Sequence, residues 1–150
     1  MKKYIFILLS LSLIYAGCVN KEKLQNNDNA SSKIIKVDVD LTILSSIMVY
    51  AEVNNIMTKP DSYLGKTIKI NGLFYSSYYD VNETMYYFVV VTDATSCCPK
   101  GIEFIWNSER KYPDDYPDEK AKIEVTGVFS SYDELGETYY HLLVENLRIL

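Results

Sequence analysis

The chain has 150 residues, a formal net charge of −5 and 48% hydrophobic residues, and its pI is near 4.9. This length suits one domain with one core. The acidic balance argues against nucleic-acid binding, because phosphate contacts require clustered Lys and Arg.

The N-terminus has the features of a secretory signal, predicted over residues 1–17. Lys2 and Lys3 precede an apolar run at 4–15, which is too short for a transmembrane helix of about 20 residues but suits a signal peptide. Cys18 follows two small residues, and the segment resembles a bacterial lipoprotein signal, in which acyl chains such as palmitate are attached to that cysteine. The position usually held by leucine is Tyr15 here, and an ordinary signal peptide with a coincidental cysteine is the alternative.

The next segment reads as a flexible tether. Residues 19–33 are polar and lack apolar periodicity, so we assign 18–37 to a lipidated linker and 38–150 to one domain. The predicted location is therefore the cell envelope, outside the cytoplasmic membrane and anchored through Cys18. That compartment permits disulfides.

An edge strand and a helix are predicted before the main strands. The stretch IIKVDVDL alternates weakly and can add an edge strand, and residues 46–60 predict a helix that Pro60 ends. We expect this helix to cover one open end of a barrel. Its apolar positions recur at helical spacing: Val49, Val53, Ile56 and Met57.

Two later segments repeat each other at an offset of 54–55 residues. One begins at Ile68 and the other at Ile123, and both alternate with period two up to a phenylalanine. Each predicts a long strand, a polar turn and a return strand. Gly72 and Gly127 fall in mid-strand, so they are expected at equivalent bends or bulges.

The strand count predicts an all-β fold with one N-terminal helix. The charged loop after the middle strand carries two prolines and cannot hold a long helix. Hairpin, single strand and hairpin match a five-stranded OB-like Greek-key barrel, with an SH3-like barrel as the competitor. The strands are expected at 66–75, 85–92, 102–107, 121–131 and 138–149.

The stretch YAEVNNIMTKPDSYLGKTIKINGLF resembles the start of the tRNA-anticodon-like OB-fold family of secreted bacterial lipoproteins. In that pattern a short helix and a Tyr-x-Gly-Lys segment lead into a strand with a glycine at its middle. The resemblance implies the fold and implies no activity, since one fold hosts many functions.

Tyrosine and acidic residues gather in the two expected hairpin loops, 75–85 and 130–138. OB-folds bind ligands between such loops. A groove of this kind would suit a cationic ligand, a sugar or a hard divalent cation, although neither loop has the EF-hand spacing of a calcium site. An envelope protein is a candidate partner, and ordinary strand and turn composition is the alternative. The candidate ligand-binding residues are Tyr78, Tyr79, Asp80, Glu83, Tyr132, Asp133, Glu134 and Glu137.

The adjacent pair Cys97 and Cys98 leaves three interpretations open. Both can be reduced and partly buried, or they can form a strained, reducible vicinal disulfide, which Pro99 would favour by extending Cys98. Alternatively, they can supply two ligands to a soft metal such as zinc or Cu(I), which needs more ligands than the pair provides. Catalysis is poorly supported, because the only histidine, His141, lies inside a strand pattern.

The signal peptide generates a test at Cys18. Cys18→Ser removes the atom that accepts the acyl chain, so the mature protein should move from the membrane fraction to the soluble fraction. Fractionation followed by immunoblotting measures this. An unchanged membrane fraction would contradict the lipid anchor.

Overall fold

The computed structural model describes residues 35–93, 95 and 97–150, which belong to a compact unit spanning 34–150. The predictions for the signal peptide, for Cys18 and for most of the tether lie outside these residues. No helix among the described residues is long and apolar enough to cross a membrane. The elements in chain order are β1 (Val39–Asp40), α1 (Ser46–Thr58), the 3-10 helix η1 (Pro60–Ser62), β2 (Thr67–Tyr79), β3 (Thr84–Val91), β4 (Lys100–Trp106), β5 (Lys122–Glu134) and β6 (Glu137–Ile149).

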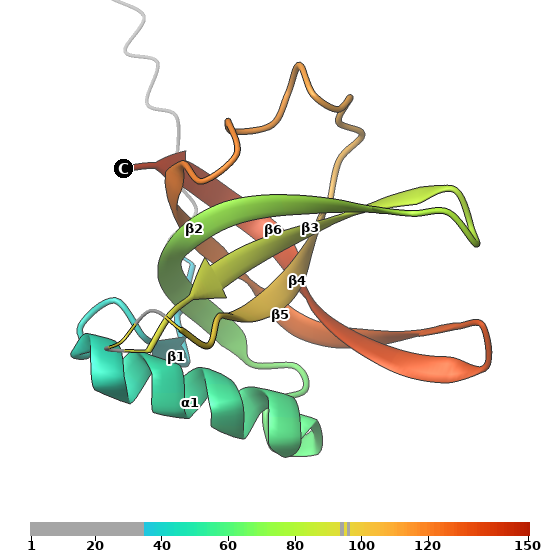
Figure 1. The fold of residues 1–150 in the computed structure, drawn as a ribbon. Coiled ribbons are helices and arrows are strands. Elements are labelled where there is room, and N and C mark those ends of the chain that lie inside the picture. The colour runs from blue at the N-terminus through green and yellow to red at the C-terminus, as the bar shows by residue number, and fades with distance from the viewer. Residues whose placement is uncertain (1–34, 94, 96) are drawn as a thin grey trace, which may run out of the picture. The chain divides into compact units, whose positions relative to one another are not determined.

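The strands form a single sheet in which five of the six close into a ring (Figure 1). The order is β1-β2-β3-β4-β6-β5, and β2 also pairs with β5. The β4–β6 pair is parallel, and the other pairs within the ring are antiparallel. The mostly-β fold with one helix and the five main strands are confirmed. The predicted edge strand is also present as β1, but it is only two residues long and parallel to β2.

The segments expected as hairpin loops are mostly strand, so the loop boundaries at 75–85 and 130–138 are wrong. β2 and β5 continue to Tyr79 and Glu134, and only short turns remain at 80–83 and 135–136. Tyr and Thr favour extended backbone, and the second turn needs only two residues with positive φ, Leu135 at 52° and Gly136 at 86°. The result is two long hairpin arms, β2–β3 and β5–β6, that extend from the same side of the ring (Figure 1).

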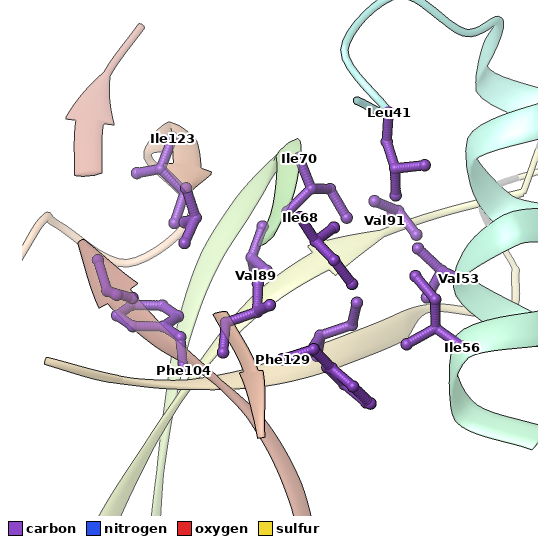
Figure 2. Close-up of a cluster of buried hydrophobic side chains, with 14 of the residues drawn as sticks. Leu41, Val53, Ile56, Ile68, Ile70, Val89, Val91, Phe104, Ile123 and Phe129 are labelled. Carbon is purple, nitrogen blue, oxygen red and sulfur yellow. The ribbon is translucent and has the colours of Figure 1, made fainter. Parts of the chain in front are cut away.

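Helix α1 packs against the ring through its predicted apolar face. Val53 and Ile56 are fully buried and project from the helix toward Ile68, Val91 and Phe129 (Figure 2). The helix ends at Thr58 because the residue before Pro60 is disfavoured in helical geometry. Val49 packs partly against the core, as expected. Met57 does not, since it is 42% exposed.

The two halves of the repeat pair with each other across an approximate two-fold axis. Ile68 of β2 lies opposite Gly127 of β5, and Gly72 lies opposite Ile123. The glycines therefore occupy equivalent positions, as the repeat predicts. A Cβ at Gly72 would lie 2.7 Å from the Val90 carbonyl oxygen, and one at Gly127 would lie 2.6 Å from the Leu143 carbonyl oxygen.

These contacts show why both Gly72 and Gly127 must lack a side chain. Each glycine sits where a long strand bends and where the backbone of its hairpin partner approaches closely. The β5–β6 register also shifts between Thr126 and Gly127, which marks the expected bulge. Because each strand bends at its glycine, β2 can pair with β5 along its first half and with β3 along its second half.

The core fills the ring from end to end. Its largest fully buried side chains are Phe74, Phe104 and Phe129, one each from β2, β4 and β5. The β4–β5 connection contains no α-helix, as predicted, and places Tyr116 over Tyr87 with the ring centroids 4.0 Å apart. The core therefore continues past the strands into this connection.

Replacing the mid-strand glycines tests the bend. Gly127→Ala should lower the free energy of unfolding by about 2–3 kcal/mol, because the new methyl group meets backbone that cannot move aside. Gly72→Ala should have a similar effect. Urea denaturation measures both changes. Gly101→Ala is the matched control, since its nearest neighbour is a Val90 side-chain methyl at 3.3 Å, and an equal loss there would contradict this explanation.

Candidate functional site

A groove lies between the two hairpin arms, and Glu103 is at its centre. Glu103 is the one residue of β4 that is in register with both neighbouring strands, opposite Phe88 of β3 and His141 of β6. Two adjoining hollows of about 340 and 330 Å³ meet there. The residues that line both hollows are Tyr86, Glu103, Tyr132 and Glu134.

The arms are joined across the groove by a carboxylate near the tip of β5. Glu134 accepts a hydrogen bond of 2.9 Å from the side-chain amide of Asn82, in the turn of the other arm. It also accepts a hydrogen bond from the Tyr86 hydroxyl of β3. Residues about 50 positions apart in the chain therefore meet over the groove and hold the two arms together.

Glu103 is a buried carboxyl group held by one phenol. It is only 9% exposed, and the Tyr132 hydroxyl lies 2.9 and 3.1 Å from its two oxygens. Burial raises the pKa of Glu103 to about 7, the Tyr132 hydrogen bond opposes the rise, and the negative charge of Glu134 adds to it. Burial and the bond to Glu103 also raise the pKa of Tyr132, so it stays a donor.

Aromatic rings surround the two carboxyl groups. Tyr132 stacks on Tyr139 with a centroid separation of 5.7 Å and meets the His141 ring edge-on at 5.4 Å. His141 is buried, its Nδ1 has no hydrogen-bond partner among the described residues, and burial lowers its pKa. At the other end of the groove the Arg110 guanidinium lies over the Trp106 ring at 4.5 Å. Such a surface can bind a ligand with a flat apolar face and a cationic or hydrogen-bonding group.

Three of the residues predicted for this site line the groove, and five do not. Tyr79, Tyr132 and Glu134 line it. Because the arms are strands, successive side chains point to opposite faces, and Asp133 instead accepts a hydrogen bond from Thr138. The predicted residues that lie outside the groove lining are Tyr78, Asp80, Glu83, Asp133 and Glu137.

The sequence-based assignment missed Tyr86, Glu103 and Tyr139. Period-two alternation could have found the first, because Tyr86 and Phe88 share a face of one strand. Glu103 was visible as the only charged residue within the apolar run from Ile102 to Trp106. A lone carboxyl group in a buried strand is unusual and points to a special environment.

The two adjacent cysteines form a separate cluster with Asp93 in the β3–β4 connection. The sulfur atoms of Cys97 and Cys98 are 3.2 Å apart, and both are exposed free thiols. The Cys97 sulfur lies 3.5 Å from a carboxylate oxygen of Asp93, which also accepts a bond of 2.8 Å from Thr95. One ligand atom from each of the three residues falls within 4.8 Å of the others. The groove and this cluster have no residue in common.

The comparisons with protein families and with curated proteins provide no template for either site. No protein-family model matches the sequence, and no curated protein matches it significantly. The roles of the groove and of the cysteine cluster are therefore inferred from their own distances, burial and charge.

The raised pKa of Glu103 predicts how stability changes with pH. The ordinary pKa of a glutamate side chain is 4.5, and that of Glu103 in the folded protein is about 7. Between these two pH values the folded protein keeps a proton on Glu103 that the unfolded chain has lost. The free energy of unfolding should therefore fall as pH rises through this window. The loss should be about 1–2 kcal/mol after solvent screening.

Urea denaturation at a series of pH values measures this slope. Glu103→Gln should flatten it, whereas Glu137→Gln, which changes an exposed carboxyl group on the same arm, should leave it unchanged. An identical slope in the native chain and in Glu103→Gln would contradict the assignment.

Proposed function

We propose that the five-stranded ring is an OB-type Greek-key barrel. The order β2-β3-β4-β6-β5, closed by the β2–β5 pair, supports this. The strand directions also support it. The chain crosses from β4 to β5, and β6 then returns between them, parallel to β4 and antiparallel to β5. In this fold, ligands bind across the second and third strands between two hairpin loops, which corresponds to β3 and β4 between the arms.

The function that the geometry supports best is non-catalytic ligand binding, and from the sequence we propose that the domain belongs to a lipoprotein anchored outside the cytoplasmic membrane. The observation that carries the proposal is the groove over Glu103, where Glu134 joins the two arms. Cys18 would attach the domain to the membrane through its acyl chains, and residues 18–37 would let it reach a ligand near the surface.

The ligand class follows from the charge and the rings of the groove. Glu103 and Glu134 favour a positively charged group, and Tyr79, Tyr132 and Tyr139 offer faces for cation–π contact. The hollow of about 330 Å³ is sized for a small group such as a substituted ammonium or a guanidinium. We therefore favour a cationic ligand, either free or as a side chain of an envelope protein. Nucleic acid does not fit, because the Glu134 carboxylate, joined by Glu103 as it ionises near pH 7, would repel phosphate.

Binding of cationic probes tests this function. Tetramethylammonium and N-acetyl-arginine amide should bind and perturb tyrosine fluorescence, and N-acetylglucosamine should not. Tyr132→Ala and Tyr79→Ala should each weaken binding about tenfold, because each removes an aromatic face from the groove. Fluorescence titration, repeated by calorimetry, measures the affinities.

Neighbouring side chains on the opposite face of the same strands serve as matched controls. Tyr78→Ala and Asp133→Asn lie one residue from the tested positions but outside the groove lining, so they should bind the probes normally. The double variant Cys97→Ser, Cys98→Ser should also bind them normally. Selective binding of the sugar would replace the cationic ligand with a saccharide, and equal losses in the control variants would contradict the groove.

A further inference from the structure

The β3–β4 connection brings a carboxylate to the cysteine pair. Asp93 follows the end of β3, and its carboxylate accepts a hydrogen bond of 3.1 Å from the backbone N–H of Cys97. The Cys97 and Cys98 sulfurs and a carboxylate oxygen of Asp93 lie within 4.8 Å of one another. From this geometry we propose that Asp93, Cys97 and Cys98 bind a zinc ion.

The spacing of the donor atoms suits a tetrahedral zinc ion. With Zn–S near 2.3 Å and Zn–O near 2.1 Å, a sulfur and an oxygen on one ion lie about 3.6 Å apart and two sulfurs about 3.8 Å apart. The distance from the Cys97 sulfur to the Asp93 oxygen is 3.5 Å, and the two sulfurs are 3.2 Å apart. The exposed cysteine side chains therefore need to separate by only about 0.6 Å, which small rotations achieve.

The donor types select zinc over other common metals. Two thiolates exclude calcium and magnesium, which require oxygen ligands. Cu(I) prefers soft ligands throughout and would leave the Asp93 carboxylate unused. Zinc accepts sulfur and carboxylate oxygen together. Three protein ligands leave one position for water or for a group from another molecule.

A cationic side chain lies beside the cluster and helps to balance its charge. Two thiolates and one carboxylate give Zn²⁺ a net charge of −1, and Lys100 follows the pair by two residues. Lys100 donates to the Asn54 side chain of α1 and lies over the Tyr50 ring at 5.1 Å. The positive charge is thus held in place by the helix that covers the ring.

The occupied site would tie the β3–β4 connection to a fixed shape next to α1. Tyr50 is close enough that its pKa is raised, first by partial burial and then by the charges of Cys98, Asp93 and Cys97. Neither cysteine lines the groove between the arms. Zinc binding is therefore independent of the ligand-binding proposal, and each can fail without the other.

Metal titration of the full chain tests the zinc site. Every sample carries Cys18→Ser, so Cys97 and Cys98 are its only cysteines, and the protein is purified in detergent, reduced and freed of metal. Cobalt should produce a thiolate-to-metal charge-transfer absorption at one ion per chain, and zinc should abolish it by displacement. Asp93→Asn keeps an oxygen that can accept the Cys97 N–H but loses the charge, so it should weaken zinc binding at least about tenfold.

The controls separate a metal site from nonspecific binding and from loss of structure. Asp61→Asn changes an exposed carboxylate in η1, just after α1, and should bind zinc normally. Cys98→Ser should remove most of the cobalt absorption while circular dichroism stays unchanged, since its thiol hydrogen-bonds only to the Cys97 sulfur among the described residues. Absence of the absorption in the reduced chain, one ion per two chains, or unaltered affinity in Asp93→Asn would each overturn the proposal.

Discussion

The pairing of β2 with β5 is the interaction on which the other features depend. It closes the ring, and the two strands turn away from each other beyond their glycines: β2 passes from β5 to β3, whereas β5 leaves β2 and keeps its pairing with β6. That turn is sterically open only where no Cβ is present, at Gly72 and Gly127. Once both strands bend, the two hairpins extend from the same side of the ring, and the distance between their tips is short enough for Glu134 to reach Asn82.

The groove and the cysteine cluster use the same ring in different ways. The groove is lined mainly by residues of β3, β4 and β5, and Tyr132 of β5 reaches across to hydrogen-bond to Glu103. Its low exposure comes from the arm that lies over it, so the stability of the arm and the protonation of Glu103 are linked. The cluster instead lies in a connection held near α1, where exposed sulfurs remain accessible to solvent.

The strands and the helix could be predicted because their signals lie in neighbouring residues of the sequence. The strands show period-two alternation, and the helix shows helical spacing that ends at Pro60. The residues of the groove were harder to predict. Aligning the two copies of the repeat by their Ser-Ser-Tyr motif suggests that Tyr78 and Tyr132 are equivalent, but the two strands differ in length before that motif. The first copy has one extra residue, Tyr75, between the shared phenylalanine and that motif. One residue reverses the face of every later side chain in a strand. Tyr132 therefore faces Glu103, whereas its sequence counterpart Tyr78 lies outside the groove lining.

The register of β4 leaves one of its two edges unpaired beyond Glu103. Lys100–Glu103 pairs with β3, but beyond Glu103 the pairing passes to β6, and β3 diverges from β4. Along this divergence, Thr84–Tyr87 of β3 and Phe104–Trp106 of β4 border one of the two hollows. The hollow beside Glu103 is therefore a consequence of register, because it opens where β4 exchanges β3 for β6 as its paired neighbour.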